Sequence, residues 1–155
     1  MAQEIERKFL VTSDAWRGQV TASARYRQGY LSDGGRCSVR VRVSGADAYL
    51  NIKSATLDIV RTEYEYPIPV ADAEEMLEHL CSGLLVEKTR HFVDNGGFVW
   101  EIDVFEGVNQ GLVIAEIELD HEHAEFPRPP WAGAEVSDDP RYYNVYLARI
   151  PYTRW

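Results

Sequence analysis

Cysteine, positive charge and long apolar runs are all scarce in this sequence. The two cysteines among 155 residues, Cys37 and Cys81, lack metal-ligand spacing, so we expect free thiols in a reducing, cytoplasmic compartment. No apolar run approaches the roughly 18 residues of a membrane helix, and the first residues lack the pattern of a signal peptide. The net charge of −9 argues against a nucleic-acid or anionic-membrane partner, because that affinity requires an excess of lysine and arginine.

Histidine is scarce as well. Of four histidines, His121 and His123 fall in an acidic, proline-bounded segment that is typical of a surface loop rather than a zinc site. The length favours a single domain over residues 1–155 with a sizeable core. A hydrophobic content of 45% and a charged content of 26% are ordinary for a soluble globular protein.

The chain opens instead on an alternation of charged and apolar residues, Glu4-Ile5-Glu6-Arg7-Lys8-Phe9-Leu10-Val11. In a strand, Glu4, Glu6 and Lys8 lie on one face, roughly 6–7 Å apart. Two carboxylates followed by an ammonium can hold a divalent cation and, beside it, an anion. The same pattern is also typical of the wet face of an edge strand.

The same alternation recurs in six further segments of the chain. Its charged or polar members are Arg40 and Arg42; Asn51 and Lys53; Arg61, Glu63 and Glu65; Lys88 and Arg90; Glu101 and Asp103; and Glu116 and Glu118. Nearly every such position carries a full charge, where chance would scatter serine, threonine, asparagine and glutamine. A solvated sheet face does not need so much charge, whereas a cavity that binds a metal and a polyanion does.

These alternating segments indicate a mainly β, α+β fold. They predict eight strands, at residues 3–11, 25–32, 37–44, 47–54, 60–67, 85–93, 98–106 and 112–120. Helices are predicted at 13–20, 70–80 and 138–148. Because closure removes unpaired edges, we expect an eight-stranded antiparallel barrel with peripheral helices and a C-terminal helix. Periodicity alone leaves open which face points inward, but mixed acids and bases that are hydrated and completed by a metal and an anion can be accommodated inside.

The charged motifs resemble those of the triphosphate tunnel metalloenzymes, the CYTH superfamily, in order and from residue 4 to about 147. The matching residues are Glu4, Glu6 and Lys8 for Glu-x-Glu-x-Lys; Arg40 and Arg42 for Arg-x-Arg; Lys53; Arg61, Glu63 and Glu65 for Arg-x-Glu-x-Glu; Lys88 and Arg90 for Lys-x-Arg; Asp103; and Glu116 and Glu118 for Glu-x-Glu. The resemblance implies an eight-stranded tunnel whose inward charges bind a triphosphate and one or two Mg²⁺ or Mn²⁺ ions.

The resemblance also implies a role for each residue. The metal ligands are Glu4, Glu6, Asp103, Glu116 and Glu118, and the phosphate-binding residues are Lys8, Arg40, Arg42, Lys53, Arg61, Lys88 and Arg90. A second metal, or Glu63 or Glu65, positions and deprotonates the attacking water. Tyr30 either pairs with Lys8 near the phosphates or is an ordinary strand aromatic. The last helix, with Arg141 and Tyr142, is expected to close one tunnel mouth.

The leading hypothesis is a metal-dependent triphosphatase, similar to bacterial inorganic triphosphatases, that cleaves tripolyphosphate to pyrophosphate and phosphate. The short chain leaves little room for a pocket that reads a base or a thiazole. The alternatives are an enzyme acting on an organic triphosphate (a thiamine triphosphatase, a nucleoside triphosphatase or a class IV adenylate cyclase), a non-catalytic polyphosphate-binding protein and a lipocalin-like barrel. We expect a small polyanionic substrate and a monomer or homodimer, while the physiological substrate and the preferred metal stay open.

Overall fold

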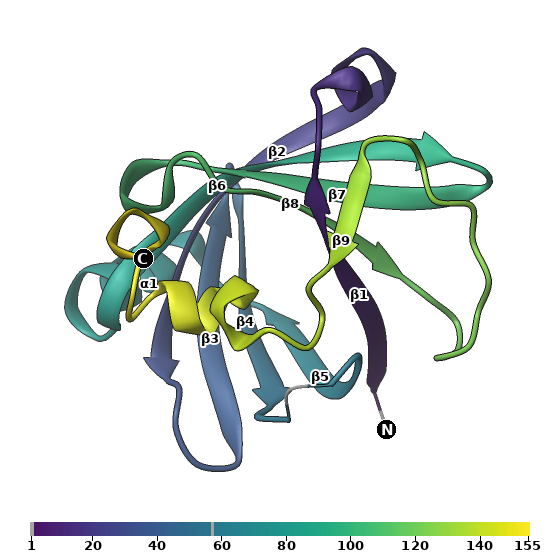
Figure 1. Ribbon diagram of the computed structural model, residues 1–155. Helices are drawn as coiled ribbons and strands as arrows, with labels where there is room; N and C mark the ends of the chain where they lie inside the picture. Colours follow the sequence, from purple (N-terminus) through teal and green to yellow (C-terminus); the bar gives the residue numbers. More distant parts are fainter. Residues whose placement is uncertain (1, 57) are drawn as a thin grey trace.

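The computed structural model describes residues 2–56 and 58–155, and its architecture is a strongly curved sheet that closes on itself (Figure 1). The strands in this part of the chain are β1 (Gln3–Val11), β2 (Val20–Ser32), β3 (Cys37–Ser44), β4 (Asp47–Ser54), β5 (Val60–Pro67), β6 (Ser82–Asn95), β7 (Phe98–Phe105), β8 (Val113–Glu118) and β9 (Ala132–Glu135). No helix within the described ranges is both long and apolar enough to span a bilayer.

Eight of these strands form the closed barrel that the sequence predicts. Their order is β5-β4-β3-β2-β6-β7-β8-β1, and a further pairing of β5 with β1 closes the ring. Every pairing is antiparallel, and the closing register sets Glu4 opposite Arg61. The short strand β9, which the sequence analysis missed, extends the same edge of β1 beyond β5, with Phe9 opposite Glu135.

The alternation along the strands separates a charged interior from an apolar exterior. The outward residues Phe9, Trp100 and Ile117 are fully buried because η1 (Ala15–Gln19) and the segment leading to β9 cover them. On another side of the barrel, α1 (Val70–His79) covers Val41 and its neighbours on β3. The main apolar clusters therefore lie around much of the barrel wall, and the lumen is left to charged groups.

One end of the lumen is closed by apolar residues. Two positions before Lys88 and Glu116 on their strands, the inward side chains become Val86 and Ile114, and both pack with Leu147 of α2 (Asn144–Leu147). The segment expected to close one tunnel mouth therefore fills this end through Leu147, with Tyr142 packed against the same cluster, whereas Arg141 is exposed and pairs with Asp139.

Several predicted boundaries are wrong. The helix expected at 138–148 is broken into η3 (Pro140–Tyr142) and the single turn α2, because Tyr143 between them is extended, with φ −88° and ψ 141°. The helix expected at 13–20 is only the five-residue 3₁₀ helix η1, and its last predicted residue already belongs to β2. Strand β6 also begins three residues early, at Ser82. Two further 3₁₀ helices are η2 (Gly107–Asn109), between β7 and β8, and η4 (Tyr152–Arg154), near the C-terminus.

Candidate active site

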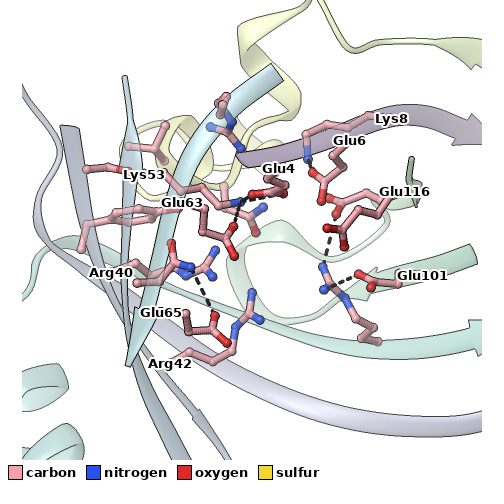
Figure 2. Close-up of a pocket in the computed structure, with 18 of the residues that line it drawn as sticks. Glu4, Glu6, Lys8, Arg40, Arg42, Lys53, Glu63, Glu65, Glu101 and Glu116 are labelled. Atoms are coloured by element: carbon pink, nitrogen blue, oxygen red, sulfur yellow. Dashed lines mark hydrogen bonds and ion pairs between the residues drawn. The ribbon is translucent and has the colours of Figure 1, made fainter. Parts of the chain in front are cut away.

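A cavity inside the barrel is lined almost entirely by charged side chains (Figure 2). Every strand of the closed ring contributes to its wall, and the lining contains seven glutamates and seven lysines or arginines. The lining residues are Glu4, Glu6, Lys8, Tyr30, Ser38, Arg40, Arg42, Asn51, Lys53, Arg61, Glu63, Glu65, Lys88, Arg90, Glu101, Glu116, Glu118, Asn144 and Val145. All of the predicted site residues apart from Asp103 meet here, so the charged rows face inward.

Three arginines in this wall have no carboxylate within ion-pair distance among the described residues: Arg40, Arg42 and Arg61. Arg40 is 7% exposed, and its Nε has no hydrogen-bond partner in that part of the chain. Burial, together with Arg40 and Arg90, lowers the pKa of Arg42. Like-charged guanidiniums that crowd one another in this way favour a bound anion. We call these three arginines the basic cradle.

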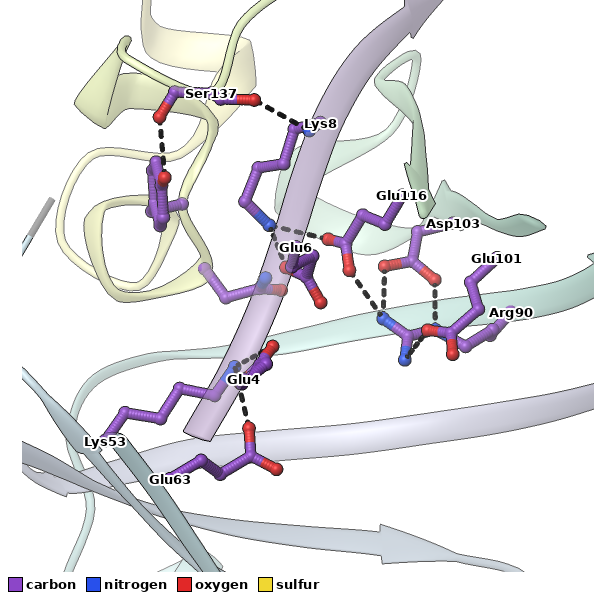
Figure 3. Close-up of polar contacts among 12 residues, drawn as sticks. Glu4, Glu6, Lys8, Lys53, Glu63, Arg90, Glu101, Asp103, Glu116 and Ser137 are labelled. Atoms are coloured by element: carbon purple, nitrogen blue, oxygen red, sulfur yellow. Dashed lines mark hydrogen bonds and ion pairs between the residues drawn. The ribbon is translucent and has the colours of Figure 1, made fainter. Parts of the chain in front are cut away.

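Lys8 is held by two carboxylates, one on β1 and one on β8. Its Nζ lies 2.7 Å from Glu116 Oε1 and 3.0 Å from Glu6 Oε1 (Figure 3). Burial acts to lower the pKa of Lys8, but Glu116 and Glu6 outweigh it and raise that pKa. The ammonium also lies 4.9 Å from the ring centre of Tyr143. Of the two alternatives for Tyr30, the structure does not favour the pairing with Lys8, whose ammonium contacts two glutamates and Tyr143 instead.

Asp103 lies behind the wall and holds two cations. Its oxygens accept from Arg90 Nε at 2.8 Å and from Arg90 Nη2 at 2.9 Å (Figure 3). One of them also accepts from Lys88 Nζ at 2.7 Å. Burial lowers the pKa of Lys88 to about 7. The negative charge of Asp103 opposes this shift, and the positive charge of Arg90 adds to it. Because both Asp103 oxygens are engaged and the side chain is fully buried, the geometry favours orientation of Lys88 and Arg90 over the metal-binding role predicted from the sequence.

Another ion-pair cluster joins β1, β4 and β5. Lys53 Nζ lies 3.0 Å from Glu4 Oε2 and 3.2 Å from Glu63 Oε2. Two residue pairs further along the same two strands, Asn51 Nδ2 donates to Glu65 Oε2 at 3.2 Å. These contacts fix both predicted water-positioning carboxylates, Glu63 and Glu65, against the wall of the cavity.

The acidic wall consists of Glu6, Glu101, Glu116 and Glu118 on β1, β7 and β8. The strand register sets Glu6 opposite Glu118 and Glu101 opposite Glu116, and like charges in such cross-strand pairs repel. Burial, together with neighbouring glutamates, raises the pKa of Glu6, Glu101 and Glu118. Figure 2 shows Glu6, Glu101 and Glu116 across the cavity from Arg40 and Arg42. Two of the three arginines of the basic cradle therefore lie across the cavity from the acidic wall.

The donor chemistry of the acidic wall fits a hard divalent cation. Carboxylate oxygens are the ligands that Mg²⁺ and Mn²⁺ prefer. Burial and neighbouring carboxylates both raise the pKa of Glu6, Glu101 and Glu118, and a bound cation would favour their charged forms. Within the ranges 2–56 and 58–155, no three acidic, histidine or cysteine side chains converge into a preformed metal site. Lys8 and Arg90 hold the carboxylate of Glu116 instead, at 2.7 Å and 3.4 Å.

Sequence reasoning missed four residues that shape this site. Glu101 shares a face of β7 with Asp103, so the alternation contained the signal, but only Asp103 was assigned to the site. Gln28, Tyr143 and Asn144 are uncharged and gave no comparable signal. The ring of Tyr143 underlies both Lys8 and Arg61, whose Cζ lies 5.1 Å from the ring centre.

Comparisons with known proteins agree with this geometry. An inorganic triphosphatase of Acetivibrio thermocellus is 49% identical over 152 residues, which cover 98% of this chain and 97% of that protein. An inorganic triphosphatase of Nitrosomonas europaea is 40% identical over 149 residues, or 94% of this chain and 96% of the relative.

Solved structures give the same result. The crystal structure of an inorganic triphosphatase matches with a TM-score of 0.70 and 38% identity, covering 96% of this chain and 95% of that one. A Hippeastrum protein shares the fold, with a TM-score of 0.62 and 17% identity over 76% of this chain and 80% of its own. The family model described as the CYTH domain matches residues 2–143. The chain belongs to the CYTH domain family.

Proposed function

We propose that this protein is a metal-dependent triphosphatase that hydrolyses inorganic tripolyphosphate to pyrophosphate and phosphate. The observation that carries the proposal is a charged cavity inside the closed barrel, in which Arg40 and Arg42 of the basic cradle lie across from the acidic wall. The names of the two relatives above support the same activity.

The basic cradle is the proposed binding site for the phosphate chain. Arg40, Arg42 and Arg61 lack anionic partners among the described residues, and a guanidinium matches phosphate oxygens through two parallel hydrogen bonds. The remaining cations of the lining, Lys8, Lys53, Lys88 and Arg90, extend this surface around the lumen. The lysines and arginines of the lining come from five strands, so together they can contact a ligand longer than two phosphates.

The acidic wall, together with Glu4 on β1, is the proposed metal site. Membership of the CYTH family implies a divalent metal, and we propose that Glu4, Glu6, Glu116 and Glu118 hold Mg²⁺ or Mn²⁺, with Glu101 beside them. A bound divalent ion would neutralise part of the phosphate charge and orient the phosphate chain.

The proposed reaction is attack by a water oxygen on a terminal phosphorus as the bond to the pyrophosphate group breaks. Glu63 or Glu65, each held in place by a neighbouring side chain, takes the proton that the water loses. Lys8 stays protonated because Glu116 and Glu6 raise its pKa, so it stabilises negative charge on the transferring phosphate. Tyr30, which also lines the cavity, is the candidate hydroxyl donor to a phosphate oxygen.

An organic triphosphate fits this cavity less well. Among the described residues that line it, Tyr30 is the only aromatic, so the lumen offers little surface on which a base or thiazole could stack. Trp16, Trp100 and Trp131 are buried among apolar residues outside the lumen. A non-catalytic polyphosphate binder is also disfavoured, because the acidic wall would repel its ligand without a cation.

Tripolyphosphate is expected to be cleaved faster than ATP or thiamine triphosphate, and pyrophosphate is expected to be a poor substrate. A shorter anion leaves some lysines and arginines of the cavity lining without a phosphate partner. Buried polar groups that are left unpaired in this way let a site reject a truncated analogue of its substrate. Phosphate release from all four compounds, with products quantified by ion chromatography, checks this order. Faster turnover of ATP, or formation of cyclic AMP, would establish the organic alternative instead.

Removal of divalent cations is expected to abolish hydrolysis reversibly. The acidic wall contains only oxygen donors, so a hard metal is the partner that its carboxylates require. Phosphate release should stop in excess chelator and return when Mg²⁺ or Mn²⁺ is added, whereas added K⁺ should not restore it. Unchanged activity in the chelator would exclude the metal assignment.

A further inference from the structure

Two amides, buried Gln28 and half-buried Asn144 in the cavity lining, connect cations on different strands of the tunnel. Asn144 Oδ1 accepts from Lys88 Nζ at 3.1 Å and from Gln28 Nε2 at 3.1 Å. Gln28 Oε1 in turn accepts from Arg42 Nε at 2.9 Å. Gln28 is fully buried, and Asn144 begins α2, the turn that carries Leu147 into the closed end of the barrel.

The direction of each amide in this chain is fixed by the cations at its ends. Arginine and lysine donate hydrogen bonds and cannot accept them. Gln28 must therefore turn its oxygen toward Arg42 and its NH₂ group toward Asn144. Asn144 must then present its oxygen, which also receives Lys88. A hydrogen-bond network with only one permitted arrangement holds its members in place.

We propose that Gln28 and Asn144 are positioning residues, which hold Arg42 and Lys88 at the angles needed to bind a triphosphate. The inference rests on the proposed function for its ligand. Arg42 has no carboxylate to fix it among the described residues, and its other close neighbour is the ring of Tyr26, 4.2 Å from Cζ. Gln28 is thus the hydrogen-bonding group that sets its direction.

The consequence is an energetic coupling between Gln28 and Arg42 in ligand binding. Gln28→Met keeps the length of the side chain and removes both hydrogen-bonding groups. It is expected to weaken binding about tenfold when Arg42 is present and less than about twofold in an Arg42→Ala background. A residue needed only for stability would weaken binding equally in both backgrounds.

Asn144 offers a second and independent comparison. Asn144→Asp keeps an oxygen that accepts from Lys88 and from Gln28, whereas Asn144→Leu has the same size and no acceptor. Binding is expected to stay within about threefold of wild type in the aspartate variant and to weaken about tenfold in the leucine variant. Thr153→Val is the matched control, because it removes another hydrogen bond of the C-terminal segment, to Val108 O, away from the tunnel.

Calorimetric titration with imidotriphosphate, an analogue with nitrogen bridges between its phosphorus atoms, and Mg²⁺ measures all of these affinities. Equal effects of Gln28→Met in both backgrounds, or equal loss in Asn144→Asp and Asn144→Leu, would overturn the positioning roles. If one variant fails to fold, the other comparison still decides the question. Wild-type protein that binds the analogue but does not hydrolyse tripolyphosphate would overturn the proposed function alone. Wild-type protein that does not bind would overturn both.

Discussion

Replacing Glu6 with glutamine is expected to lower kcat for tripolyphosphate at least about 100-fold, comparable with the loss of one electrostatic stabiliser of a transition state. Glu6 faces Glu118 across the β1–β8 pair, and its Oε1 accepts from Lys8 Nζ at 3.0 Å. The amide has nearly the same shape but no charge. It therefore weakens the proposed metal site and the hold on Lys8 together, and steady-state phosphate release measures the loss.

A matched control separates this effect from a general effect of removing a carboxylate. Glu75→Gln makes the same chemical change at an exposed position on α1, outside the tunnel, and is expected to leave kcat unchanged. Melting curves of both variants show whether the fold is kept. A folded Glu6→Gln variant with wild-type turnover would contradict the role assigned to the acidic wall.

Replacing Arg40 with methionine is expected to stabilise the empty protein while weakening substrate binding about 100-fold. The Arg40 side chain is buried, and its Nε has no hydrogen-bond partner in the described part of the chain. A buried polar group without a partner costs roughly 1–3 kcal/mol, so its removal should raise Tm by at least about 2 °C. Bound phosphate removes that penalty in the wild-type protein, so the variant loses both the contact and the stabilisation by ligand.

Thermal unfolding with and without saturating tripolyphosphate tests both parts of this expectation. In the wild type, ligand should raise Tm strongly, whereas in Arg40→Met the empty protein should melt higher and shift little. Arg17→Met is the control, because Arg17 lies outside the barrel and pairs with Asp14 on the surface. A lower Tm for empty Arg40→Met, or an undiminished shift, would show that Arg40 serves the fold rather than the ligand.

The sequence predicted the barrel and most of its lining because both depend on one strong signal. A full charge at every second position, as in Glu4, Glu6 and Lys8, specifies a strand and one of its faces. Whether that charged face points into the barrel or out of it needed an energetic argument. Residues that face inward and residues that face outward both recur at every second position, so the pattern alone does not distinguish them. The structure places the charges inside and apolar residues such as Trp100 under the peripheral segments.

The parts that were not predicted depend on contacts between distant segments. Asp103 and Glu101 have the same charge, share a face and both pair with Arg90. Only the tertiary structure shows that Asp103 also holds Lys88 behind the wall, while Glu101 lines the lumen. The helical pattern at 138–148 gave no sign of a break at Tyr143. That residue is extended, and its hydroxyl donates to Ser137 O at 2.6 Å while its ring lies beside the Lys8 ammonium.

The central claim is that phosphates bind the basic cradle and a divalent metal binds the acidic wall of one tunnel. A crystal structure with Mn²⁺ and imidotriphosphate tests it most directly, because the anomalous signal of manganese locates the metal independently of the phosphorus atoms. The predicted result is manganese beside Glu6, Glu116 and Glu118, with phosphate oxygens on Arg40, Arg42 and Arg61. Phosphates bound outside the barrel, or manganese without a contact to these carboxylates, would contradict the claim.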